Sequence, residues 1–279
     1  MHYSAFVSAF LASVAVAIPV EENPFPGATK WTANHQVQPG DVIVPFKDSA
    51  YVVKEEEYLA KLKAKGIKIG APKLDESWKP YDPAVHRRWT PPTGPWWVNN
   101  TKPWGNSTDH KEEKRDGCDS TYYITTDKTE TFVDWDVQMS PVVCAVGDMD
   151  ISVSSGYNVA NAVGGSAGAD LGFVKDKLGA NLGIDYSKTW TTLTSVVTKG
   201  TIKDGNCGVM ITKPLTTRRS GRQFQGCVGS AKEVGTWYAD SHEEGSYNGI
   251  SWVEGAISVC AKPGTNPPLS LCNGQGNFR

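Results

Sequence analysis

The first 117 residues contain no cysteine, although the whole chain has six. No two of the six lie two to four residues apart, and His242 is the only histidine after residue 115. This spacing excludes the usual zinc sites. The sequence also lacks a P-loop, a His-Glu-x-x-His motif and a double-glycine dinucleotide fingerprint. It therefore predicts neither a metal nor a cofactor.

Net charge is small: 28 Lys and Arg oppose 30 Asp and Glu, which gives −2 at pH 7. So small a value does not predict a nucleic acid or an anionic membrane as partner. Long hydrophobic runs are missing beyond the N-terminus. The sequence therefore predicts a soluble product with no stable membrane anchor.

The N-terminus carries the one long apolar run. Residues 5–16 are apolar but too few to span a bilayer, which needs about 20 residues. Ala15-Val16-Ala17 has the small-x-small pattern of a signal-peptidase site. We therefore expect a signal peptide over residues 1–17, cleaved after Ala17, and a secreted, extracellular protein.

All six cysteines lie within residues 116–279. An even number of cysteines in an exported chain predicts disulfides, and six cysteines allow 15 pairings. Closing short loops in this way removes roughly 3 kcal/mol of unfolded-chain entropy for each bond. We expect neighbours in sequence to pair: Cys118–Cys144, Cys207–Cys227 and Cys260–Cys272.

Residues 18–115 form an N-terminal region without cysteine. Asp41–Phe46 alternates and is rich in valine and isoleucine, which predicts a strand. Residues 50–65 predict a helix, because three glutamates stand early, lysines stand late and Gly66 follows.

Residues 76–108, here called the Trp/Pro strap, interleave tryptophans and prolines. Proline removes amide donors, so we expect an extended, irregular chain. Its indoles could plug a groove on the C-terminal region, form a platform that stacks sugars, or pack against one another. Two sequons predict surface glycans at Asn99 and Asn106.

A charged run then ends in Lys114-Arg115. Kexin-type proteases of the secretory path cut after such a pair in an exposed segment. Cleavage there would make residues 18–115 a pro-segment and release residues 116–279 with every cysteine. The alternative is a plain charged linker.

The C-terminal region, residues 116–279, shows several runs with a period of two, separated by turn signals. It predicts a mainly β fold: a disulfide-stapled antiparallel sandwich or distorted barrel, preceded by the small α+β and irregular N-terminal region. One short helix is expected at about residues 169–178, with Asp170 at its start and Gly179 at its stop. Ser220-Gly221 and Asn248-Gly249 are interpreted as turns.

Several segments resemble secreted fungal candidate-effector-like proteins, and the likeness covers roughly residues 116–279. The resemblance implies a secreted fungal protein that acts on a host or a competitor, and it implies no catalytic residue. The segments are Gly168–Lys175, Leu182–Thr192, Gly208–Met210, Pro214–Gly221, Gly226-Cys227 and Ile250–Gly255, with Cys260.

His242, Glu243 and Glu244 form the most reactive-looking cluster. A secreted ribonuclease would pair the histidine with a glutamate and with arginines for general acid–base work. A serine triad would also need His242 as its base. A solvated turn is the alternative, and we prefer it.

Four aspartates form two i,i+2 pairs on expected strands: Asp134 with Asp136, and Asp148 with Asp150. Paired carboxylates catalyse the reaction in glycosidases and bind the ion in calcium sites. Alternating acids, however, more often form the solvent-exposed face of a strand. Arg218, Arg219 and Arg222 form one basic patch, which could bind a phosphate or an acidic partner, or decorate a solvated hairpin tip.

These features favour a secreted effector-like protein, and thus a virulence factor, that binds a host or competitor protein or glycan. A secreted hydrolase acting on RNA or glycans is the enzymatic alternative. The third is a membrane-acting toxin that inserts residues 149–197, a stretch with a glycine-rich segment.

Overall fold

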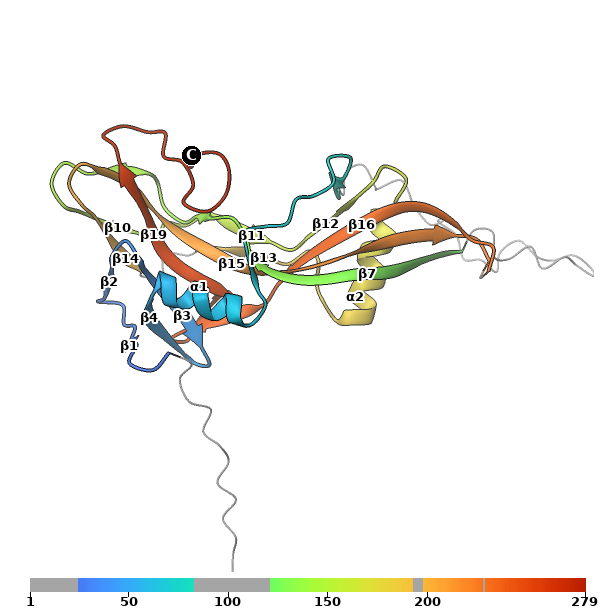
Figure 1. Cartoon of the computed structure of the whole chain (residues 1–279), viewed down its shortest axis with the longest axis horizontal. Coiled ribbons are helices and arrows are strands. Elements are labelled where there is room, and N and C mark those ends of the chain that lie inside the picture. The colour runs from blue at the N-terminus through green and yellow to red at the C-terminus, as the bar shows by residue number, and fades with distance from the viewer. Residues whose placement is uncertain (1–24, 83–120, 193–197, 228) are drawn as a thin grey trace, which may run out of the picture.

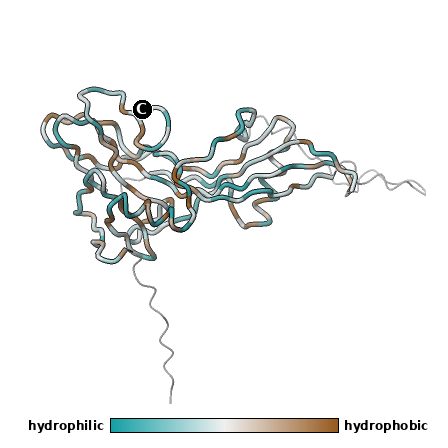
Figure 2. Tube along the Cα trace, viewed as in Figure 1, coloured by the Kyte–Doolittle hydropathy of each residue, from teal (hydrophilic) through white to brown (hydrophobic). Residues whose placement is uncertain are grey.

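A computed structural model describes residues 25–82, 121–192, 198–227 and 229–279. These residues are mainly β, as the sequence predicts, with two helices. Figure 1 shows an elongated molecule whose longest strands follow the long axis. Hydrophobic and hydrophilic residues are interspersed along the strands (Figure 2), as expected for sheets with one buried face.

The strands and helices have the following bounds. The strands are β1 (Thr29–Lys30), β2 (Gln36–Val37), β3 (Asp41–Phe46), β4 (Ser49–Lys54), β5 (Lys68–Ile69), β6 (Lys79–Pro80), β7 (Tyr122–Val133), β8 (Val137–Gln138), β9 (Val143–Cys144), β10 (Met149–Ser152), β11 (Asn158–Ala160), β12 (Ala162–Gly165), β13 (Thr189–Thr191), β14 (Lys199–Ile202), β15 (Asn206–Gln225), β16 (Lys232–His242), β17 (Glu244–Tyr247), β18 (Ile250–Val253) and β19 (Gly255–Pro263). The helices are α1 (Glu55–Ala64) and α2 (Leu171–Leu182).

The 20-residue strand β15 organises the fold. Its first half pairs with β19, and its second half lies between β7 and β16. The main sheet runs β1-β4-β3-β19-β15-β16-β12-β6. It stays open, so of the two expected forms, a sandwich or a distorted barrel, the structure has no closed barrel. The small sheet β10-β14-β2 contacts β15 and β19, and the largest core lies between these two layers.

Ser220-Gly221 is not a turn, because β15 continues through both residues. The pairing with β7 shifts register between them, as at a β-bulge. A side chain at Gly221 would collide with the carbonyl oxygen of Thr125. The glycine therefore marks a close approach of two strands, and the residues around it are not a hairpin tip.

Each helix packs one face on a sheet. Helix α1 buries Tyr58 and Leu62, and Gly66 follows it at φ 79°. It starts later than expected, because residues 50–54 belong to β4. Helix α2 begins where expected: Asp170 accepts a hydrogen bond from the Phe173 amide at 3.0 Å. It ends at Leu182, because Gly183 supplies the left-handed residue that was expected at Gly179.

The disulfides correct two expected pairings. Cys144 is bonded to Cys207, so neither Cys118–Cys144 nor Cys207–Cys227 forms. The physical reason is the register: β9 pairs with the start of β15, which places these two residues directly opposite each other. Cys260–Cys272 forms as expected. Cys227 is disulfide-bonded as well.

The N-terminal region is built into the sheets of the C-terminal region. Strand β3 pairs with β19, β2 with β14, β5 with β7 and β6 with β12. Figure 1 shows these blue and cyan segments lying beside the later strands. Residues 25–82 thus supply part of the common sheet.

Several predictions from the sequence fall outside the described residues. They are the signal peptide with Ala17, the glycans at Asn99 and Asn106, the cleavage pair Lys114-Arg115, Cys118 and most of the Trp/Pro strap.

Candidate functional site

The sheet β7-β15-β16-β12 has two differently covered faces. Because side chains alternate along β16, Trp237 and Ala239 pack with α2, while Tyr238 and Asp240 occupy the opposite face. Pro72 and Trp78, from the segment before β6, contact that second face. Trp78, the one described tryptophan of the Trp/Pro strap, stacks on Tyr238 with ring centroids 5.3 Å apart. Its Nε1 donates to Thr236 Oγ1 at 2.8 Å, so this part of the strap packs on the C-terminal sheet.

Arg218 lies buried in the middle of this face. Its Nε and Nη2 donate to the two carboxylate oxygens of Asp240, each at 2.7 Å. Its Nη1 donates to the Pro72 carbonyl at 3.0 Å. The guanidinium also lies 5.0 Å from the Phe132 ring centroid and 5.3 Å from that of Tyr238. Arg218 therefore joins residues 70–82 to the sheet.

The expected basic patch is dispersed. Arg219 donates to Ser241 Oγ at 3.2 Å. Arg222 forms an exposed ion pair with Asp127 at 2.7 Å. Each of the three arginines thus has its own partner, and their guanidinium groups do not converge on one anion site.

His242 is not part of a solvated turn, because it lies mostly buried at the end of β16. Its Nε2 is 3.0 Å from Thr216 Oγ1, and its Nδ1 is 3.1 Å from Asn161 Oδ1. Burial lowers the pKa of His242 to about 4. Glu244 is exposed and pairs with Lys188 at 2.8 Å. The histidine is therefore neutral and held by two structural partners.

One motif missed in the sequence is Gly164–Gly168, which reads Gly-x-Ser-x-Gly. Ser166 follows β12 shortly before α2, the strand–turn–helix setting of a nucleophile elbow. However, Ser166 Oγ accepts a hydrogen bond from the Thr236 amide at 2.9 Å. His242 lies six residues farther along β16, about 20 Å away at the usual strand rise. The described residues therefore form no triad at Ser166.

The four aspartates separate into two groups. Asp148, just before β10, and Asp150, within it, are both exposed. Asp148 pairs with Lys203 at 2.7 Å. Asp136 is buried, contrary to the expectation of a wet strand side. Among the described residues, the one group of three metal-ligand types is Asp136 with Cys260 and Cys272. Their sulfurs are joined to each other, so this group holds no metal.

Asp134 borders a cleft of about 510 Å³, here called the Trp135 cleft. Trp135 and Leu74 both line it and are 41% and 40% exposed. Polar groups surround these two apolar side chains. The lining residues are Ala71, Pro72, Lys73, Leu74, Glu76, Asp134, Trp135, Arg218 and Gln275.

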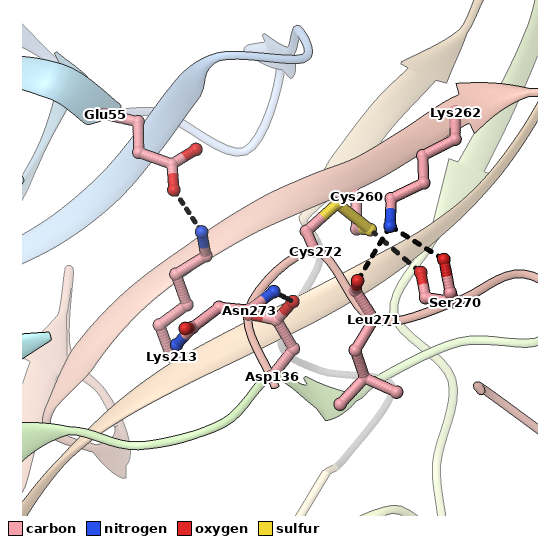
Figure 3. The surroundings of a disulfide bond; sticks show 9 residues. All are labelled: Glu55, Asp136, Lys213, Cys260, Lys262, Ser270, Leu271, Cys272 and Asn273. Atoms are coloured by element: carbon pink, nitrogen blue, oxygen red, sulfur yellow. Dashed lines mark hydrogen bonds and ion pairs between the residues drawn. A yellow bond between two sulfur atoms is a disulfide. The ribbon is translucent and has the colours of Figure 1, made fainter. Parts of the chain in front are cut away.

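The C-terminal loop forms one wall of the Trp135 cleft, and Figure 3 shows what anchors this loop. The disulfide Cys260–Cys272 ties it to β19. The Asn273 amide donates to Asp136 Oδ2 at 2.6 Å, and the Asp136 amide donates to the Asn273 carbonyl at 2.9 Å. Gly274 then lies against Trp135 so closely that a Cβ atom would come within 2.9 Å of Trp135 Cγ.

The Asp134 carboxyl is held in a fixed position at the cleft. Its Oδ1 accepts from the Trp135 amide at 2.7 Å, and its Oδ2 lies 3.3 Å from Thr216 Oγ1. Burial raises the pKa of Asp134, and nearby Asp240 adds to the rise while Arg218 opposes it. The cleft thus combines an exposed indole with a carboxyl group, an arginine, an amide and a second acid. Such a set can stack a ring and hydrogen-bond hydroxyl groups.

In the sequence Val133, Trp135 and Val137 alternate with two aspartates, which predicts that their side chains share one face of a strand. Trp135 is exposed because β7 ends at Val133, before it. No sequence pattern marks the other lining residues as part of a site, because only tertiary contacts bring Leu74, Glu76 and Gln275 to the cleft.

Comparison with protein-family models, with curated proteins and with solved structures finds no match for this chain. No helix among the described ranges is long and apolar enough to cross a membrane.

Proposed function

We propose that this chain is an exported, effector-like protein that acts outside the cell by binding carbohydrate of a host or a competitor in the Trp135 cleft. Two intrachain disulfides support export, because such bonds persist in oxidising compartments. The leader expected over residues 1–17 supports it as well. Recovery from culture fluid of a chain that begins at Ile18 would test this part.

The observation that carries the binding proposal is the exposed indole of Trp135 inside a lined cleft. A tryptophan offers a large flat apolar surface, and sugar rings present apolar C–H faces that fit on it. Around it, Asp134, Glu76 and Gln275 offer carboxyl and amide groups for hydroxyls. A purely apolar ligand would cover Glu76 and Gln275 without offering them a hydrogen-bonding partner, which is unfavourable.

The fixed position of the C-terminal loop also supports the binding proposal. A disulfide and the two hydrogen bonds between Asp136 and Asn273 fix the loop that carries Gln275. A pre-organised site loses little conformational entropy when it binds, which improves affinity. This rigidity favours recognition of a defined ligand shape.

The direct test is titration with soluble oligosaccharides of chitin, β-glucan, xylan and mannan, followed by calorimetry. We expect one class to bind and Trp135→Ala to weaken it by at least about tenfold, the effect of losing a central aromatic contact. Leu182→Ala is the matched control, because Leu182 is 44% exposed and lies at the end of α2, outside the cleft. Equal affinity of both variants, or binding of no class, would refute the proposal.

One observation favours a hydrolase as second candidate. Burial raises the pKa of Asp134, which shares the cleft with Glu76, so two carboxyl groups in different surroundings lie at one site. Incubation with the bound oligosaccharide and analysis of reducing ends distinguishes the two functions. Products that form with the wild type and not with Asp134→Asn would show that the protein is a glycosidase. An oligosaccharide that stays intact would support a binding protein without this activity.

The membrane-acting alternative has less support. Helix α2 buries Leu171, Val174 and Leu178 against the sheet. These side chains would have to leave that core before the segment could enter a bilayer. Dye release from liposomes would reveal such an activity.

A further inference from the structure

One face of α1 carries both apolar and charged residues toward the same pocket. Tyr58, Lys61, Leu62 and Lys65 follow one another at intervals of three and four residues, so they share a side of the helix. Tyr58 and Lys65 are seven residues apart, about 10 Å along the axis. All four line one pocket of about 300 Å³.

The pocket lies between the N-terminal and C-terminal parts of the chain. From the first part come Phe25 and Val44, and from the second come Leu215 and Glu254. Most of the wall is aliphatic or aromatic. The volume is at the lower end of the range for small-molecule sites. The pocket is separate from the Trp135 cleft, with no lining residue in common.

A buried hydroxyl without a partner lies behind the wall of this pocket. Tyr58 is only 2% exposed, and its Oη has no hydrogen-bond partner in the described part of the chain. The neighbouring Tyr247 hydroxyl donates to the backbone carbonyl oxygens of Val253 and Gly255 instead. The Tyr58 Oη has essentially no accessible surface, so it lies behind the apolar wall, and the ring of Tyr58 is the part that a ligand meets.

The charges at the pocket are unbalanced. Lys61 Nζ lies 4.7 Å from the Phe25 ring centroid, and within the described ranges neither Lys61 nor Lys65 has a carboxylate at ion-pair distance. Glu254 is the one acid in the lining. Burial raises the pKa of Glu254, nearby Glu243 raises it further, and Lys65 opposes them. The pocket therefore offers two cations and one acid that is disfavoured in its charged form.

We propose that the Tyr58 pocket binds a small amphipathic carboxylate. Its apolar body lies against Phe25, Val44 and Leu62. Its carboxylate lies at Lys61 and Lys65. Charge-assisted bonds of this kind are the strong ones in proteins, which explains why a site with two lysines would select an acid over an alcohol or an amine.

The test uses three probes of one chain length: decanoate, decanol and decylamine, each titrated into the whole protein below its aggregation limit and followed by calorimetry. Decanoate should bind, and the other two should bind at least about tenfold more weakly. Lys61→Gln and Lys65→Gln should each weaken decanoate by about tenfold. The matched control is Lys63→Gln, an exposed lysine of α1 that does not line the pocket, and it should have no effect.

Tyr58→Phe keeps the ring and removes the hydroxyl that has no protein partner. Because this hydroxyl lies out of reach of a ligand, the variant should fold and bind decanoate as the wild type does. Equal affinities for the three probes, no binding of decanoate, or an equal loss in Lys63→Gln and Lys61→Gln would overturn the proposal. Trp135→Ala should leave decanoate binding unchanged, so this test and the carbohydrate test can fail independently.

Discussion

Arg218 and Asp240 form a bidentate ion pair across β15 and β16, with both N–O distances at 2.7 Å. Their side chains are only 8% and 12% exposed. For such a buried pair the loss of hydration offsets much of the attraction, so the net stabilisation is small. Removing one partner, however, leaves a charge buried without compensation.

We therefore expect Asp240→Ala to lower the free energy of unfolding by about 3–5 kcal/mol in urea titrations. The double variant Arg218→Met, Asp240→Leu should recover much of this loss, because it leaves no buried charge. Asp127→Ala is the matched control: it breaks the exposed pair with Arg222, 40% and 47% exposed, and should cost less than about 1 kcal/mol. Similar losses in Asp240→Ala and Asp127→Ala would contradict this account.

Much of the fold could be predicted because local signals were unambiguous. Asp41–Phe46 is a strand at its predicted bounds. Asp170 caps α2, and Asn248-Gly249 turns between β17 and β18 with positive φ at both residues. Each of these elements depends on a few neighbouring residues, which the sequence displays directly.

The predictions that were wrong concern residues whose surroundings are formed by segments far away in the sequence. Gly221 resembles a turn residue, but it is required where β15 approaches β7. Arg218 and His242 look exposed in the sequence, and they are covered by segments far away in the chain. Cys144 pairs with Cys207 because β9 and β15 are neighbours, which no sequence separation reveals. The Trp135 cleft was missed for the same reason.

Stability should depend on pH through His242. Its pKa is about 4 in the folded protein and 6.5 as a free side chain, so below pH 6.5 the unfolded state takes up a proton that the folded state refuses. This contribution therefore destabilises the fold as pH falls from 6.5 to about 4, by about 3 kcal/mol in all. The raised pKa of Asp134 has the opposite effect on stability. As pH falls, the folded state takes up this proton at a higher pH than the unfolded state does, so protonation of Asp134 stabilises the fold.

The difference between wild type and His242→Gln isolates the histidine. Glutamine can still hydrogen-bond Thr216 and Asn161, but it does not titrate. Urea titrations at pH 7.5 and pH 4 should show the variant gaining about 3 kcal/mol relative to wild type at the lower pH. Parallel behaviour of the two proteins would show that His242 is not held neutral.

The two described disulfides should differ in their contribution. Cys144–Cys207 spans 63 residues and Cys260–Cys272 spans 12. Loop-closure entropy predicts that the free energy of unfolding falls by roughly 4 kcal/mol when Cys144 and Cys207 are both replaced by alanine, and by roughly 3 kcal/mol when Cys260 and Cys272 are. Non-reducing peptide mapping should recover a peptide pair joined through Cys144 and Cys207; a pair joined through Cys144 and Cys118 would contradict the structure.

Gly274 should matter for the cleft through its contact with Trp135. A Cβ atom there would come within 2.9 Å of Leu271 Cδ2 and of Trp135 Cγ, at φ +127°. Gly274→Ala should therefore displace the indole and weaken carbohydrate binding. Gly276→Ala is a close control, because φ is also positive (+98°) but nothing lies within 4 Å of the added atom. If both variants bind alike, the Gly274 contact does not shape the site.

Cleavage after Lys114-Arg115, if the secretory pathway performs it, should not free the C-terminal region of its N-terminal partner. Strands β2, β3, β5 and β6 pair with β14, β19, β7 and β12, and Val42 and Tyr58 share a core with Val133. Both fragments should elute together in native size-exclusion chromatography and separate only in denaturant. The uncleaved control is Lys114→Gln, Arg115→Gln, which should elute at the same volume. Dissociation of residues 18–115 in native buffer would show that this region is a removable pro-segment, and that the shared sheet is too weak to hold it.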